Sequence, residues 1–275
     1  MKNSKRIMIA LLAVGLLAAC GKKEDNPVTE PVEQQEIKID VAAEAEQYKS
    51  LIMGQMDNFT ADTELLATYV KEGKLEEAQK LYPLVTMYYE RMLPIASNFQ
   101  ELNVKINGEA IEGKEETDTS GFQKLAHGLF EEKKTAGYEE AADELVENVK
   151  ALQAELPSID VSENNVLAST VTIYNDMATN RLSTQSIANN EVYAVKAQTE
   201  AAEDILEIFI PRVSTESAET ASEALKDLNE TVAYYEVGKE DYVNYSFFTA
   251  KQKEELKTAV QRVAAALQKM NDSLK

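Results

Sequence analysis

The sequence predicts an all-α protein made of two antiparallel four-helix bundles packed side by side. Ala, Glu, Leu and Lys dominate the 275 residues, while Gly and Pro number only 10 and 6, which is typical of helical proteins. Apolar residues recur at spacings of three and four along most of the chain, as on the buried face of a helix. No run alternates β-branched and polar residues between turn residues, so no sheet is expected.

The clearest periodicity marks a helix over 75–100. Its apolar seam consists of Leu75, Ala78, Tyr82, Val85, Tyr89, Met92, Ala96 and Phe99. This is the register of a helix that faces other helices. Pro83 and Pro94 lie inside it, and because each lacks a backbone N–H, each should bend or break the helix. Residues 101–118, rich in Asn, Gly, Glu and Thr, are expected to form a loop.

The same spacing places the other helices. They are expected at 41–71, 120–134, 138–155, 163–187, 190–212, 215–236 and 249–274. Gly73 suits the C-terminal cap of the first of these helices, and Ser162 the N-cap of the helix at 163–187. Thr249 and Gln252 form a capping-box pattern at the start of the last helix. A tyrosine-bearing connection, 238–248, precedes it.

Residues 1–19 read as a lipoprotein signal peptide. A basic start precedes an apolar run from Ile7 to Leu17 and two alanines, as in secretory signals. The sequence Leu17-Ala-Ala-Cys20 resembles the lipobox of bacterial lipoproteins, which implies cleavage before Cys20 and acylation of its thiol, for example with palmitate. An ordinary signal or a membrane anchor is disfavoured, because the apolar run is short for a bilayer span.

Four regions follow from these features. The signal peptide at 1–19 precedes a flexible acidic tether, 20–40, that lacks the apolar residues to fold. The break from Pro157 to Ser162 then separates a first helical bundle, 41–157, from a second, 158–275. The lipid bilayer, reached through acylated Cys20, is therefore one expected partner, and the expected location is the cell envelope, on the extracytoplasmic side of the membrane.

Composition also excludes classes of function. A net charge of −20 argues against nucleic acid as a partner, because phosphate binding needs a basic face. The chain has one Cys and one His, so no Ser-His or Cys-His nucleophilic array is expected. Neither a Gly-x-Ser-x-Gly elbow nor a phosphate-binding Gly-rich loop occurs. The sequence therefore predicts a protein that is not an enzyme.

Glu90 and Arg91 are the polar residues in the middle of the apolar helix at 75–100. Glu90 is the best candidate for a functional acid, and the alternative is a salt bridge to Arg91 or to another helix. His127 stands alone between Ala126 and Gly128. A structural role is favoured for it, although it could also join carboxylates from another helix in a mixed site.

Two segments resemble the EfeM/EfeO family of imelysin-like envelope proteins. They read Tyr-Tyr-Glu-Arg-Met-Leu-Pro-Ile-Ala at 88–96 and Ser-Gly-Phe-Gln-Lys-Leu-Ala-His-Gly-Leu-Phe at 120–130. The family pattern has Tyr-Tyr-Glu-Arg-Ile-Glu-Pro-Ile-Ala followed by Thr-Gly-Phe-His-x-x-Glu-x-x-Leu-Phe. The resemblance implies two helical bundles and an extracytoplasmic part in iron uptake, working with an iron permease and often a haem peroxidase. Some relatives are classed as peptidases on the same His-x-x-Glu motif.

The family's metal-binding positions are largely replaced in this chain. Glu90 and Arg91 match the pattern, whereas Gln123 stands in place of its His. The other replaced acids are at Leu93, Ala126 and Ala194. His127, one position past the replaced Glu, should point about 100° away around a helix. We therefore expect iron or another divalent cation to bind only weakly around Glu90, Arg91, Gln123 and His127.

Three functions remain at this point. The first is a lipid-anchored component of an iron-uptake system, in a binding or accessory role. The second is a non-metal interaction module that binds a peptide, glycan or partner protein in the cleft between the bundles. The third, a metallopeptidase, is disfavoured because activating water requires a bound metal with an open position and a base.

Overall fold

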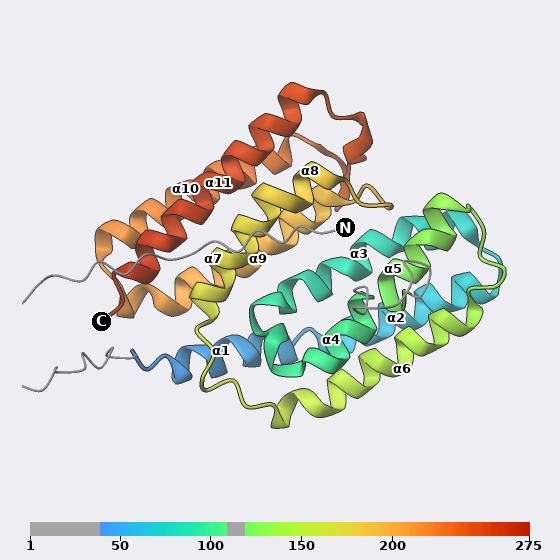
Figure 1. The fold of residues 1–275 in the computed structure, drawn as a ribbon, viewed down its shortest axis with the longest axis horizontal. Coiled ribbons are helices and arrows are strands. Elements are labelled where there is room, and N and C mark those ends of the chain that lie inside the picture. The colour runs from blue at the N-terminus through green and yellow to red at the C-terminus, as the bar shows by residue number, and fades with distance from the viewer. Residues whose placement is uncertain (1–38, 109–118) are drawn as a thin grey trace, which may run out of the picture. The chain divides into compact units, whose positions relative to one another are not determined.

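The computed structural model describes residues 39–108 and 119–275, and these form an all-α protein with one small hairpin (Figure 1). The predicted fold class is confirmed. The signal peptide, Cys20 and the tether as far as residue 38 lie outside the described residues, as do residues 109–118 of the predicted loop. Within the described ranges, no helix is both long and apolar enough to cross a membrane.

The α-helices are α1 (Ala42–Met53), α2 (Met56–Lys71), α3 (Leu75–Met92), α4 (Gln100–Asn107), α5 (Gly121–Ala126), α6 (Glu139–Glu155), α7 (Val166–Asp176), α8 (Leu182–Thr184), α9 (Glu191–Phe209), α10 (Thr215–Ala233) and α11 (Ala250–Asp272). Short 3-10 helices are η1 (Leu93–Phe99), η3 (Leu156–Ser158), η5 (Ile210–Arg212) and η6 (Tyr245–Phe247). Two π-helical segments are η2 (His127–Glu131) and η4 (Met177–Arg181). The strands are β1 (Glu236–Gly238) and β2 (Asp241–Tyr242).

Two predicted helices in the first half are interrupted. The helix expected at 41–71 is divided at Gly54 into α1 and α2, where glycine weakens a helix interior. The helix expected at 75–100 continues through Pro83 but tightens into η1 beside Pro94, which cannot donate to the preceding turn. The chain then re-enters a helix, α4, so the prediction of a loop beginning at 101 is wrong for 101–107.

The second half also departs from expectation in two places. The N-cap of α7 is Asn165, whose side-chain oxygen accepts a hydrogen bond from the N–H of Ala168 at 3.1 Å, rather than Ser162. The expectation of no sheet is also wrong, because β1 and β2 pair antiparallel within the tyrosine-bearing connection. Strands of two and three residues are too short to show an alternating pattern. The predicted capping box of Thr249 and Gln252 is confirmed.

The helices pack in two groups that meet at α3 and α9 (Figure 1). In one group α2 lies against α3 and α6, and α4 and α5 lie against α6. In the other, α10 packs on α9 and α11, and α7 packs on α11. Buried apolar side chains form one cluster that includes residues of both groups. The arrangement as two four-helix bundles, with a boundary at 157, stays a prediction.

Glycine brings α5 close to the end of α4. Gly121, the first residue of α5, has φ +52°, and a Cβ there would lie 2.0 Å from the carbonyl oxygen of Ile106. No side chain fits at that distance, and the positive φ also disfavours any residue with a Cβ. Gly121 therefore sets where α5 begins, and with it the position of the segment that carries Gln123 and His127.

Candidate functional site

Two sides of α3 contact different parts of the protein. One face carries Tyr82 and Tyr89 into the core, where the Tyr82 hydroxyl donates to the carbonyl of Phe122 at 3.0 Å and both rings contact the Phe122 ring. Thr86 and Glu90, one turn apart, lie on the neighbouring side of α3 and contact α9 and the segment before it. Because successive residues of a helix are about 100° apart, Glu90 points about 100° away from Tyr89 around the axis. The polar candidates on α3 therefore face the second group of helices.

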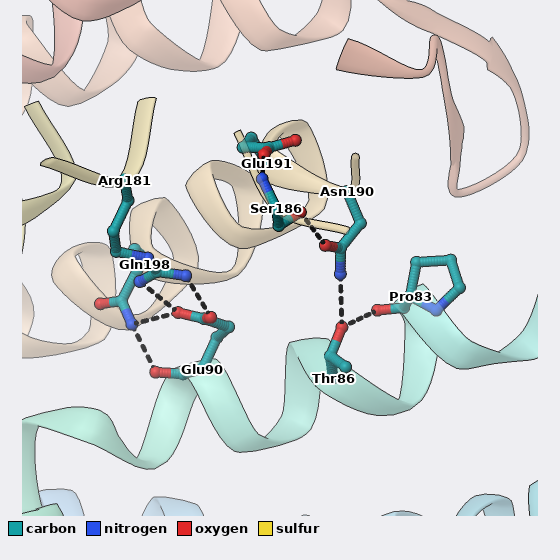
Figure 2. Close-up of polar contacts among 8 residues, drawn as sticks. All are labelled: Pro83, Thr86, Glu90, Arg181, Ser186, Asn190, Glu191 and Gln198. Atoms are coloured by element: carbon teal, nitrogen blue, oxygen red, sulfur yellow. Dashed lines mark hydrogen bonds and ion pairs between the residues drawn. The ribbon is translucent and has the colours of Figure 1, made fainter. Parts of the chain in front are cut away.

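Glu90 is held by an arginine that comes from η4. Arg181 donates from Nη1 to Oε2 at 3.0 Å and from Nη2 to Oε1 at 2.5 Å, a bidentate ion pair (Figure 2). The side chain of Glu90 is only 14% exposed. A carboxylate this far from water needs a counter-charge, and a planar guanidinium matches its two oxygens. The charge of Glu90 is thus neutralised by the protein itself.

Gln198 of α9 completes the contacts of Glu90. Its Nε2 donates to the backbone carbonyl of Glu90 and, at 3.2 Å, to Oε2 of the carboxylate (Figure 2). Gln198 is fully buried, and its amide oxygen has no hydrogen-bond partner in the described chain. The amide is therefore oriented by its donors toward Glu90, at the cost of leaving its own acceptor unpaired.

The electrostatics of Arg181 follow from this pairing. Burial opposes the charge of its guanidinium, but the adjacent Glu90 carboxylate and its hydrogen bonds outweigh burial and raise the pKa of Arg181 above its ordinary value. Arg181 stays charged at every physiological pH. Arg181 therefore supplies a permanent positive charge beside Glu90.

Arg91 does not pair with Glu90. Its guanidinium binds Glu200 of α9, with an Nε–Oε2 distance of 2.8 Å and a second contact from Nη2. Its backbone carbonyl accepts a hydrogen bond from the buried hydroxyl of Tyr48. Arg91 and Glu90 are adjacent in sequence, so their side chains leave α3 in different directions. Both form ion pairs that fasten α3 to the second group, and the proposed salt bridge from Glu90 is made to another helix.

Gln123 and His127 lie in a separate place. Gln123 is exposed on α5. His127 is 46% exposed and has its Nδ1 3.0 Å from the hydroxyl of Tyr138 and its Nε2 3.5 Å from Glu131. The Tyr138 hydroxyl also donates to Glu132 at 2.6 Å, and burial together with this carboxylate raises the pKa of Tyr138 to about 12. His127 thus belongs to a surface network with acids from its own segment.

The four candidate residues therefore do not form one cluster. Glu90 and Arg91 contact α9 and η4, whereas the contacts of His127 are with 131 and 138. Within 39–108 and 119–275, no group of three or more His, Cys, Asp or Glu side chains is placed to hold a metal ion. The donor set also fits a metal poorly, because Glu90 already receives a guanidinium and an amide. Weak cation binding at these positions stays a prediction.

Sequence reasoning missed Arg181 and Gln198. Gln198 lies among alanines and other apolar residues of its helix, but Arg181 is surrounded by Thr179, Asn180, Ser183 and Thr184, so its neighbours give no signal like that of Glu90. Their distance along the chain from Glu90, 91 and 108 residues, leaves no spacing from which a contact could be inferred.

The fold and the site define an all-α protein in which the carboxylate of Glu90, in the middle of α3, is bound by the guanidinium of Arg181. No family model matches this chain. An EfeM/EfeO family lipoprotein of Staphylococcus haemolyticus (strain JCSC1435) is 28% identical over 282 residues, covering 97% of this chain and 98% of the relative. EfeM/EfeO family lipoproteins of Staphylococcus aureus strains NCTC 8325 / PS 47 and COL are 26% identical over 243 residues, 85% of this chain and 86% of each relative.

These relatives confirm the resemblance that the sequence motifs predict. The chain is a homologue of the EfeM/EfeO family lipoproteins over nearly its whole length.

Proposed function

We propose that this protein is a lipid-anchored, extracytoplasmic accessory component of an iron-uptake system and not an enzyme. Its relatives are named EfeM/EfeO family lipoproteins, and its own sequence carries the lipobox-like ending at Cys20. Acyl chains on Cys20 would hold the folded unit at the membrane. The partners implied by the family resemblance are an iron permease and a haem peroxidase in the same envelope.

One observation supports an accessory role over direct metal capture. Glu90, the acid that matches the family pattern, is bound by Arg181 through both oxygens and by Gln198. A divalent cation would have to displace a guanidinium whose own charge would then be left without a partner beside the metal. The Glu90 site thus serves to connect α3 with the second group of helices. The protein would then act through contacts made by its surface.

Titration of the mature chain with Fe²⁺ under anaerobic conditions, with ferric citrate and with Zn²⁺ tests the metal part of this proposal. In isothermal titration calorimetry, we expect no metal to bind the wild type with sub-micromolar affinity in a way that depends on Glu90, so Glu90→Gln should leave the titration unchanged. Gln preserves the shape and the hydrogen bond from Gln198 but leaves Arg181 without its counter-charge. The circular dichroism and melting temperature of the variant are therefore compared with those of the wild type before its binding is interpreted. Tight binding that depends on Glu90 would contradict the accessory role.

Anchoring and the link to iron need a separate experiment in cells. Cys20→Ser should abolish incorporation of labelled palmitate and release the protein from the membrane fraction, whereas the wild type should be labelled and sediment with membranes. Uptake of radioactive iron by a deletion strain should be restored by the wild-type gene and restored less by Cys20→Ser. Full restoration by a chain with neither label nor membrane association would show that anchoring is not required.

A further inference from the structure

The connection between α10 and α11, residues 234–248, exposes apolar side chains that the fold leaves uncovered. Tyr234 is 79% exposed, Phe247 78% and Val237 66%, and these are the most exposed large apolar side chains in the parts of the chain that the structure describes. Single exposed apolar residues are ordinary on a protein surface, but three within one short connection indicate a contact outside the fold. We call this connection the exposed tip.

Buried aromatic residues hold the exposed tip in place. The ring centroids of Tyr235 and Phe248 are 4.1 Å apart, and the Phe248 ring also contacts that of Tyr245. The buried hydroxyl of Tyr245 donates to the carbonyl of Leu182 in α8 at 2.8 Å. These rings fasten the connection to the rest of the second group, so the fold does not need the outward side chains of the tip. A segment held in this way loses little conformational entropy when it binds.

The charge of the chain changes at the exposed tip. Residues 39–233 carry 15 Lys or Arg against 37 Asp or Glu, whereas residues 234–275 carry seven against six. The tip together with α11 is therefore close to neutral in a protein whose net charge is −20. A membrane surface that contains anionic lipids repels acidic segments. Such a surface should repel the tip and α11 less than it repels the rest of the chain.

An anchored protein could bring the exposed tip to the membrane. α10 and α11 lie side by side, and the tip is at their end away from the C-terminus (Figure 1). Arg212 donates to the backbone carbonyls of Asp40 and Lys275, so the described chain starts near the other end of α10, whose 19 residues are about 28 Å long. Residues 20–38, fully extended, would span at most about 65 Å. An anchor at Cys20 therefore lets the tip meet the bilayer.

The small area of the exposed tip favours lipid over a folded protein partner. Aromatic side chains bury roughly 150–250 Å² each, so the three exposed side chains offer on the order of 400 Å². A stable protein–protein interface takes about 800 Å² from each partner. A bilayer needs less, because the lipid anchor already keeps the protein beside it at a high effective concentration. Tyrosine is also enriched where a membrane meets water, since its ring is apolar and its hydroxyl stays hydrated.

We propose that the exposed tip inserts Tyr234, Val237 and Phe247 into the lipid–water interface of the bilayer that carries the anchor. The proposal rests on the lipid anchoring in the proposed function, and not on iron or on the Glu90 site. The inserted tip gives the protein one orientation on the membrane, with the end of α10 near Arg212 turned away from the lipid.

Tryptophan fluorescence on vesicles tests this proposal, because the chain contains no Trp. The mature chain has a single thiol, at Cys20, which is coupled to a maleimide lipid in vesicles of phosphatidylcholine and phosphatidylglycerol. Because the anchor is supplied chemically, a tip that does not insert is distinguished from a chain that is not acylated in cells. In Phe247→Trp, emission should shift to shorter wavelength on the vesicles and be quenched by lipids with brominated acyl chains.

Ile210→Trp is the matched control. Ile210 is 53% exposed and lies in η5, at the opposite end of α10 from the exposed tip. Brominated lipid quenches only on contact, so quenching at position 247 should be at least about threefold stronger than at position 210, about 28 Å away. Quenching that is equal at the two positions, or stronger at 210, would overturn the proposal.

A second pair of variants separates insertion from a fold defect. Tyr234→Asp added to Phe247→Trp should lower the quenching by about half or more, because a charge is costly to place in lipid. Leu65→Asp, at an exposed position of α2, should leave the quenching unchanged, and both should keep the circular dichroism of the parent. A blue shift at position 247 that grows with protein concentration without lipid would assign the tip to contacts between copies of the chain and overturn the proposal.

Discussion

Removal of the guanidinium of Arg181 should destabilise the protein in a way that removal of both charges does not. In Arg181→Met, the carboxylate of Glu90 would remain 14% exposed with no cation beside it, because Gln198 supplies only a neutral donor. Removing one partner of a fully buried pair costs roughly 3–5 kcal/mol. Since the Arg181 side chain is 32% exposed, water should offset part of this, and we expect a loss of about 2–3 kcal/mol.

Urea unfolding followed by circular dichroism measures this loss. The double variant Glu90→Gln/Arg181→Met should recover most of it, because a neutral amide no longer requires a counter-charge and still accepts from Gln198. Lys226→Met, which breaks an exposed pair with Glu230, should leave the midpoint nearly unchanged.

Two outcomes would refute this reasoning. If Arg181→Met unfolds at the same urea concentration as the wild type, the ion pair contributes nothing that water cannot replace. If the double variant is as unstable as the single one, the loss comes from packing of the arginine stem and not from an unpaired carboxylate.

Three further predictions concern other parts of the molecule. Burial raises the pKa of Asp204, so its charged form opposes folding. Asp204→Asn should therefore raise the melting temperature of the protein at pH 7 but not below pH 4. Equal melting temperatures of the variant and the wild type at pH 7 would contradict this. Arg212 donates to Glu44, near the start of the described chain, at 2.7 Å and to the backbone carbonyl of Lys275 at 3.0 Å. Arg212→Met should therefore speed amide hydrogen exchange at both ends of the described chain. Unchanged exchange there would show that Arg212 does not hold the two ends together. Gly121→Ala should lower the free energy of unfolding by more than about 2 kcal/mol, because the added Cβ meets the carbonyl oxygen of Ile106. Gly137→Ala adds a Cβ in open space and should cost only about 1 kcal/mol, for its positive φ. Equal losses would show that the contact of the Cβ at 121 with the carbonyl is unimportant.

Periodicity predicted the helices well where it was long and regular. The seam of α3, the length of α6 and the capping box at Thr249 all agree with the structure, because helix formation and capping depend on neighbours within a few residues. The same locality explains the errors. Gly54 interrupts a pattern that remains apolar on both sides, and a pattern that continues gives no sign that the backbone changes direction. The break beside Pro94, in contrast, agrees with the prediction made from its missing N–H.

At the candidate site, the sequence predicted which residue is important but not which residues it contacts. Glu90 was found because a carboxylate within an apolar run must have a partner when it is buried. Which partner it has could not be read from the sequence, because Arg91 lies next to it and yet binds Glu200 on α9. The choice depends on the direction in which each side chain leaves α3, and on which residues of η4 and α9 the packing brings opposite.

The sequence by itself determined the all-α class, the apolar face of each long helix and the resemblance to the EfeM/EfeO family, since all three rest on residue type and short-range spacing. Only the tertiary structure decided that Arg181 and Gln198 take the place opposite Glu90 and that His127 lies apart from it. These are contacts between residues far apart in the chain, and they form only when packing of the helix faces has set the distances between them.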